Sequence, residues 1–172
     1  MTQALVAELR DGLPSFGYTP LTVLAGTWKP NALPAFDRYC VWVAPPTMNV
    51  WTERRITARE IQYLLRADIF LLVQNFSEED SLYGTTAPSL GLFQMIADVK
   101  DLLRLTDLGG LLSRTYTETA GDVLFHTGAA SGFDTGPRSW VHRARVPYVA
   151  ETEPFCPPID AVVSPAPVGL VN

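Results

Sequence analysis

The residue types that could carry out chemistry in this 172-residue chain are few and scattered. Asp134-Thr135-Gly136 matches the catalytic triplet of aspartic peptidases. That chemistry requires the triplet to follow an apolar strand directly, so that two carboxylates come close enough to share a proton. Here Gly132 and Phe133 precede the triplet within a loop of small residues. A glycine-rich turn is the commoner use of this pattern, and a dimeric peptidase built on Asp134 is the enzymatic alternative.

Other reactive residues do not form a recognisable site. The possible zinc ligands are His126, His142, Cys40 and Cys156. None of them stands at a ligand spacing such as Cys-x2-Cys or His-x3-His, so only the fold could bring them together. Neither a nucleophile elbow nor a phosphate-binding Gly-Lys-Ser/Thr motif is present in the sequence. We therefore predict a protein that is not an enzyme, with no catalytic residue, no cofactor and no metal.

Charged residues near the middle of the chain have a simple structural interpretation. The acidic residues Glu60 and Asp68 stand beside Arg59 and Arg66. In strands, such neighbours form cross-strand or solvent-facing ion pairs. The pattern predicts pairing of this kind and no acid–base chemistry.

The composition indicates a folded globular protein, with 47% hydrophobic and 18% charged residues. A net charge of -5 argues against a nucleic-acid-binding surface. Positive charge is carried almost wholly by arginine, which suits bidentate contacts at protein interfaces. No apolar run approaches the roughly 20 residues that span a bilayer. With only two cysteines and no N-terminal signal-peptide pattern, we expect a soluble protein made in a cytoplasm, with free thiols.

The rest of the chain must be organised around residues 56–76, ITAREIQYLLRADIFLLVQNF. The second half of this stretch is a continuous apolar run, and the first half nearly alternates polar and apolar residues. Two strands, or one long strand that passes into a fully buried region, fit the pattern. A helix is the rival interpretation, because Ile61, Leu64, Leu65 and Ile69 are spaced for one helical face. The β-branched and aromatic residues favour strand.

Two amphipathic helices are expected to cover this β region, over residues 2–13 and 90–105. Ser89 is a plausible N-cap of the second helix. Its inward face would comprise Leu92, Phe93, Ile96, Val99, Leu102 and Leu103. Further strands are predicted at 21–24, 38–44, 114–119, 122–127 and 138–153, where Pro147 suits an edge or a bulge.

These elements predict an α+β fold, with a mainly antiparallel sheet covered by two helices. The sheet and its helices would form one domain over residues 1–153. Five prolines and no amphipathic period predict an extended Pro-rich tail over residues 154–172.

Two predicted loops contain the residue types of a protein interface. Residues 47–53 include Met48, Val50 and Trp51, and Arg54 and Arg55 follow directly. A tryptophan on such a loop either packs back onto the core or anchors a partner, and both interpretations stand. Residues 77–88 form an acidic loop that is either solvated or opposes the arginines of another subunit. Its acidic residues are Glu78, Glu79 and Asp80.

The order of elements and three strand motifs resemble the tail terminator (tail completion) proteins of long-tailed bacteriophages. The motifs are YCVWV at 39–43, RADIFLLVQNF at 66–76 and PRSWVHRARVPYVAETEPF at 137–155. The resemblance covers about residues 1–155 and transfers no individual functional residue. It implies a structural virion protein that forms a ring, usually a hexamer, at the head-proximal end of the tail tube. That ring would join the tail to the head connector.

The resemblance also implies the partners and the location. The partners would be other copies of the chain, the tail tube protein and the head completion or connector protein. DNA would only pass through the lumen as cargo, and no membrane would be involved. The protein would be assembled in the host cytoplasm and would be located in the neck of the virion. In a ring, the Trp51 segment and the acidic segment would meet between subunits, or the acidic residues would line the lumen and repel phosphates. The alternative is another head–tail connector or minor virion protein.

Overall fold

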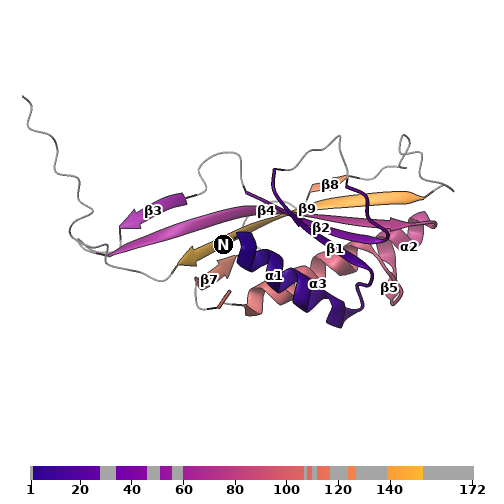
Figure 1. Cartoon of the computed structure of the whole chain (residues 1–172), viewed down its shortest axis with the longest axis horizontal. Coiled ribbons are helices and arrows are strands. Elements are labelled where there is room, and N and C mark those ends of the chain that lie inside the picture. The colour runs from indigo at the N-terminus through magenta and orange to yellow at the C-terminus, as the bar shows by residue number, and fades with distance from the viewer. Residues whose placement is uncertain are drawn as a thin grey trace, which may run out of the picture.

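The computed structural model describes residues 2–27, 34–45, 51–55, 60–106, 108–109, 112–116, 124–126 and 139–152. Within these ranges the chain is α+β, and a mixed, mostly antiparallel sheet carries its helices on one face (Figure 1). The predicted fold class is therefore confirmed. The predicted Pro-rich tail lies outside the described residues.

The sheet is built on one long antiparallel pair, β4 (Ile61–Asn75) and β9 (Trp140–Thr152). On one side of β4 lies β2 (Tyr39–Ala44), which pairs in turn with the parallel strand β1 (Leu21–Ala25). The strand β3 (Trp51–Arg55) pairs with the first residues of β4. On the far side of β9 lie β7 (Leu112–Tyr116) and β8 (Leu124–His126).

The central stretch is one long strand, as one of the predicted interpretations had it. Ala67, Ile69 and Leu71 alternate along the face that the helices cover, and all three are buried. Leu72 is also buried, although it belongs to the opposite face. Burial on both faces explains why this half of the strand is a continuous apolar run, since alternation appears only where one face is wet.

At about the same level of the sheet, the described partner of β4 changes from β2 to β3 and that of β9 changes from β7 to β8. Between Ala44 and Trp51 the chain advances seven positions while its partner β4 advances three. Between Tyr116 and Leu124 the chain advances eight positions while β9 advances four. Pro147 falls between the register positions of β7 and β8. This is a suitable place for a residue that has no N–H to donate to a ladder.

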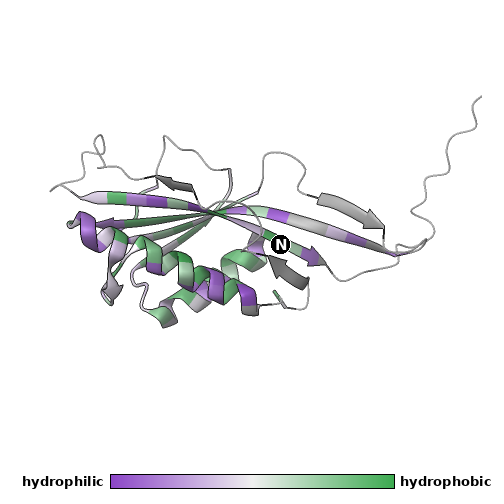
Figure 2. Cartoon of the chain, turned by 180° about the vertical axis from the view of Figure 1, so that it is seen from behind, coloured by the Kyte–Doolittle hydropathy of each residue, from purple (hydrophilic) through white to green (hydrophobic). Residues whose placement is uncertain are grey.

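The main helices are α1 (Thr2–Gly12), followed by the short 3-10 turn η1 (Leu13–Phe16), and α3 (Leu92–Leu105). Bands of hydrophobic and hydrophilic residues alternate along α3 (Figure 2). Its buried residues include Met95, Ile96, Val99 and Leu103, which pack with the inner face of the sheet. Both predicted helices are confirmed in position.

Details of the second helix differ from the prediction. Gly91, and not Ser89, is the N-cap, because Ser89 belongs to the short strand β6 (Ser89–Leu90). Phe93 was expected to face inward, but its side chain is partly exposed. Met95 takes the interior position instead, and Phe93 stacks on Tyr83 at the rim of the core.

The predicted acidic loop contains regular structure. Residues Glu78–Tyr83 form the helix α2, and β5 (Thr85–Thr86) pairs with β6. Ser77 caps α2 by accepting a hydrogen bond from the Asp80 amide at 3.2 Å. The acidic residues of the first turn are favoured there by the helix dipole. The prediction of a loop over residues 77–88 was therefore wrong, and the sequence signal that would have corrected it is the Ser-x-x-Asp cap.

The prediction of a loop over residues 47–53 was also wrong at its end. Trp51 to Glu53 belong to β3, while residues 46–50 lie outside the described residues. The physical reason is that β4 is long enough to pair with two successive segments. Once β2 has ended at Ala44, the first residues of β4 still have free ladder groups, and β3 satisfies them.

Candidate functional site

The residues that might have formed an active site or a metal site are not brought together. Asp134 and Cys156 lie outside the described residues. His142 lies on the helix-covered face of β9, whereas Cys40 pairs with Leu72 on the opposite face of the sheet. In the described ranges no three His, Cys, Asp or Glu side chains are grouped as metal ligands.

One buried serine–histidine pair does occur, and its geometry makes it a structural anchor. Ser81 of α2 and His142 of β9 are both fully buried, with Ser81 Oγ 2.5 Å from His142 Nδ1. The serine hydroxyl donates its only proton to the Glu78 carbonyl at 2.8 Å. The imidazole must therefore donate from Nδ1 to Ser81 Oγ, which leaves the serine without a base. The pair ties α2 to the sheet.

The electrostatics of His142 agree with that role. Burial lowers its pKa below the ordinary value, and the nearby Glu78 carboxylate partly opposes this shift. The ring is therefore neutral near pH 7 and carries its one proton on Nδ1. Its Nε2 atom is buried and has no hydrogen-bond partner within the described part of the chain.

A second buried polar group joins the N-terminal region to α3. Tyr18 donates to Asp98 Oδ2 at 2.6 Å, and Gln94 donates to Asp98 Oδ1 at 2.8 Å. Tyr18 also meets the ring of Tyr39 edge-on, with ring centroids 5.1 Å apart. Burial raises the pKa of Tyr18 well above its ordinary value, so the hydroxyl remains a donor. These two hydrogen bonds satisfy both oxygens of the Asp98 carboxylate where α3 packs against the N-terminal region.

On the face of the sheet away from the helices, the predicted ion pairing of Asp68 is observed. Arg145 donates from Nε at 2.9 Å and from Nη2 at 2.8 Å to Asp68 Oδ1. The two residues stand diagonally across the β4–β9 ladder, which brings long side chains within reach of one another. The partner is therefore an arginine of β9, and not the neighbouring Arg66. Arg59 lies outside the described residues.

The first predicted interaction segment lies on a projecting arm. Met48 and Val50 lie outside the described residues, whereas Trp51, Arg54 and Arg55 belong to β3. We use the term arm for Trp51–Arg55 together with the paired residues of β4, 61–65. In Figure 1 the arm extends well past the helices at one end of the molecule.

The second predicted segment lies at the other end. Glu78, Glu79 and Asp80 form the first turn of α2 and are exposed. We use the term α2 end for α2 together with Phe93, whose ring stacks on Tyr83. Figure 1 places α2 at the end of the sheet opposite to the arm.

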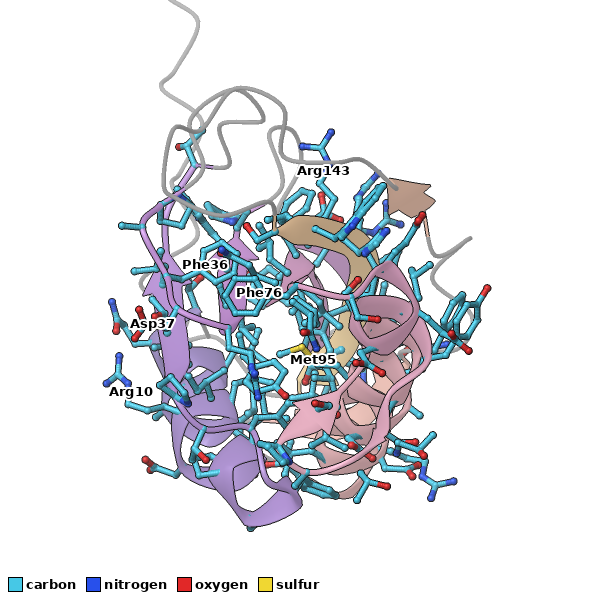
Figure 3. The ribbon with its side chains drawn as sticks, turned by 90° about the vertical axis from the view of Figure 1, so that its right-hand side faces the viewer. Arg10, Phe36, Asp37, Phe76, Met95 and Arg143 are labelled. Atoms are coloured by element: carbon cyan, nitrogen blue, oxygen red, sulfur yellow. The ribbon has the colours of Figure 1, made fainter. Side chains whose placement is uncertain are left out.

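The sequence pattern did not predict the exposed aromatic side chains at this end of the molecule. Phe76 is 69% exposed, Tyr83 61% and Phe93 41%. The rings of Tyr83 and Phe93 stack with centroids 5.2 Å apart. In the view from this end, Met95 points inward and Arg143 lies on the face away from the helices (Figure 3). Periodicity could not reveal this surface, because Phe76 continues a strand pattern and Phe93 a helix pattern.

The distance between the arm and the α2 end determines whether their charged residues can contact each other. The strand β4 runs from the arm to the α2 end, and its 15 residues span about 46 Å at roughly 3.3 Å per residue. The arginines of β3 and the acidic residues of α2 therefore cannot meet within one subunit.

Comparisons with known proteins add no family. No protein-family model matches the chain, and no curated protein matches it. Among the described residues, no helix is both long enough and apolar enough to cross a bilayer.

Proposed function

We propose that this protein is a structural subunit of a bacteriophage tail, of the tail terminator class. Copies would assemble head to tail into a ring, usually a hexamer, that caps the tail tube and joins it to the head connector. Its partners would be other copies of the chain, the tail tube protein and the head completion protein. Its place would be the neck of the virion.

One observation carries this proposal: the subunit has chemically different surfaces at opposite ends of its long axis. A contact between two different patches is heterologous, and repeating it generates a ring when the rotation closes. The arm carries Arg54 and Arg55, and the α2 end carries three exposed acidic residues. Arginine–carboxylate contacts around apolar anchors are typical of protein interfaces.

The described residues with reactive side chains favour a structural role over an enzymatic one. The Ser81–His142 pair is fully buried, and its hydrogen-bond directions leave the hydroxyl unactivated. The acidic first turn of α2 also suits a subunit around a DNA channel, since negative charge would keep the passing phosphates from binding.

The test combines a mass measurement with electron microscopy of particles. The parent chain should give a ring mass in solution, and Trp51→Ala with Arg54→Glu and Arg55→Glu should give a folded subunit that no longer assembles. Phage made with that variant should have tails of abnormal length or tails unattached to heads. Arg10→Glu with Arg104→Glu is the matched control, since it reverses two exposed arginines on the helices.

The other outcomes are equally definite. A parent chain that stays monomeric, or a triple variant that gives normal rings and normal particles, would overturn the proposal. A ring found elsewhere in the neck would indicate another connector or minor virion protein. Peptidase activity that Asp134→Asn abolishes would indicate the enzyme.

A further inference from the structure

The α2 end has the composition of a protein interface and not of an ordinary solvated surface. Of the four large hydrophobic side chains that are exposed in the described ranges, two belong to this end, Tyr83 and Phe93, and their rings stack on each other. Aromatic residues are enriched in the centres of interfaces, whereas acidic residues are found at their polar rims. Here Glu78, Glu79 and Asp80 stand next to the aromatic residues in the sequence and are also exposed.

This surface is held rigidly, although it lies at the end of the molecule. The Ser81–His142 hydrogen bond fixes α2 against β9. The Gly91 amide donates to the Gly84 carbonyl at 2.7 Å. A Cβ atom at Gly84 would lie 1.8 Å from the Ser89 carbonyl oxygen, so only glycine permits this approach. A surface that is already ordered loses little conformational entropy when a partner binds.

The arm offers a surface of matching chemistry. The register places Trp51 opposite Leu65, and Leu65 belongs to the same alternate set of positions as Ala67 and Ile69. That set is covered by the helices farther along β4, but the arm extends beyond the helices (Figure 1). Arg54 and Arg55 lie in the same strand, and Arg66, at the root of the arm, is exposed. Apolar positions beside arginines complement aromatic residues beside carboxylates.

We propose that the α2 end is the docking site for the arm of a second copy of this chain. The inference rests on the proposed ring, and it names the two surfaces that meet in it. The aromatic residues of the α2 end receive the Trp51–Leu65 region, and the acidic turn of α2 pairs with Arg54 and Arg55. Charge complementarity and the separation of the two surfaces within one subunit identify the occupant as a second copy.

A mixing experiment tests this pairing directly. Variant one carries Tyr83→Ser and Phe93→Ser, so it keeps the arm and loses the docking site. Variant two carries Arg54→Glu and Arg55→Glu, so it keeps the docking site and loses the arm. At a concentration at which the parent is just assembled, each variant alone should be monomeric, because its concentration for half-assembly is raised at least about tenfold. An equimolar mixture should give a heterodimer and no larger species, because only one productive contact can form.

A charge exchange provides the second measurement. Adding Glu78→Arg and Glu79→Arg to variant two should restore the ring mass, since the pairing is reformed with the signs reversed. This chain keeps the aromatic residues, so it remains informative if the serine variants fail to fold. Far-ultraviolet circular dichroism and the melting temperature establish folding for every variant, and Arg10→Glu with Arg104→Glu is again the control.

The outcomes separate this inference from the proposed function. If the parent and variant one form rings while variant two stays monomeric, the arm docks elsewhere, so the docking inference is wrong and the ring proposal stands. If the variants are folded monomers but neither the mixture nor the exchanged chain assembles, the two surfaces do not meet each other. A monomeric parent overturns both proposals.

Discussion

Removing the hydroxyl group from each of two buried tyrosines should have different effects on stability. Tyr18 and Tyr148 are both fully buried. The Tyr18 hydroxyl donates to the Asp98 carboxylate at 2.6 Å, whereas the Tyr148 hydroxyl has no hydrogen-bond partner within the described residues. A hydrogen bond to a charged group contributes about 1.5–3 kcal/mol, and burying an unpaired polar group costs about 1–3 kcal/mol. Tyr18→Phe should therefore lower the free energy of unfolding, and Tyr148→Phe should leave it unchanged or raise it.

The assay is urea unfolding at pH 7, followed by circular dichroism, with the melting temperature as a second readout. For a chain of this length, a loss of 1.5–3 kcal/mol corresponds to a fall of roughly 3–12 °C. Tyr83→Phe is the control, since it removes a hydroxyl from an exposed side chain. Equal losses for Tyr18→Phe and Tyr148→Phe would refute the reasoning, because hydrogen bonding would then not distinguish the two sites.

Three further changes test other parts of the structure. Ile96→Asp buries an unpaired charge in the core and should destabilise the domain by several kcal/mol, roughly 3–5, whereas Ala97→Asp on the exposed face should melt near the parent. Burial lowers the pKa of His142, so His142 takes up a proton in the unfolded chain before it does so in the folded one as the pH falls below about 6.5. The free energy of unfolding should then drop by up to about 1.4 kcal/mol per pH unit. An equally steep pH dependence in the His142→Gln variant would contradict this prediction. Deleting residues 154–172 should leave the melting temperature nearly unchanged, and a large loss would show that the tail packs on the core.

The elements of the fold are local properties, and the sequence determined most of them. The continuous apolar run from Ile69 to Val73 indicates a strand that is buried on both faces, and the apolar face of α3 indicates the helix that covers it. Such patterns are readable because the periods of strand and helix differ. The predicted secondary structure was wrong where two effects compete over a few residues. The Ser-x-x-Asp cap stabilises the helix α2 where an acidic loop was predicted. The unpaired edge of β4 binds β3 where the second loop was predicted.

Only the tertiary structure decided which residues meet and which surfaces remain exposed. Tyr18 binds Asp98 across 80 positions, and Ser81 binds His142 across 61. No spacing rule connects residues so far apart, because their meeting depends on the register of β4 and β9 and on how the helices pack. The same register sets the arginines of the arm and the acidic turn of α2 at opposite ends of one strand. The sequence determined the chemistry of those two segments, and the length of β4 decided that they cannot meet within one chain.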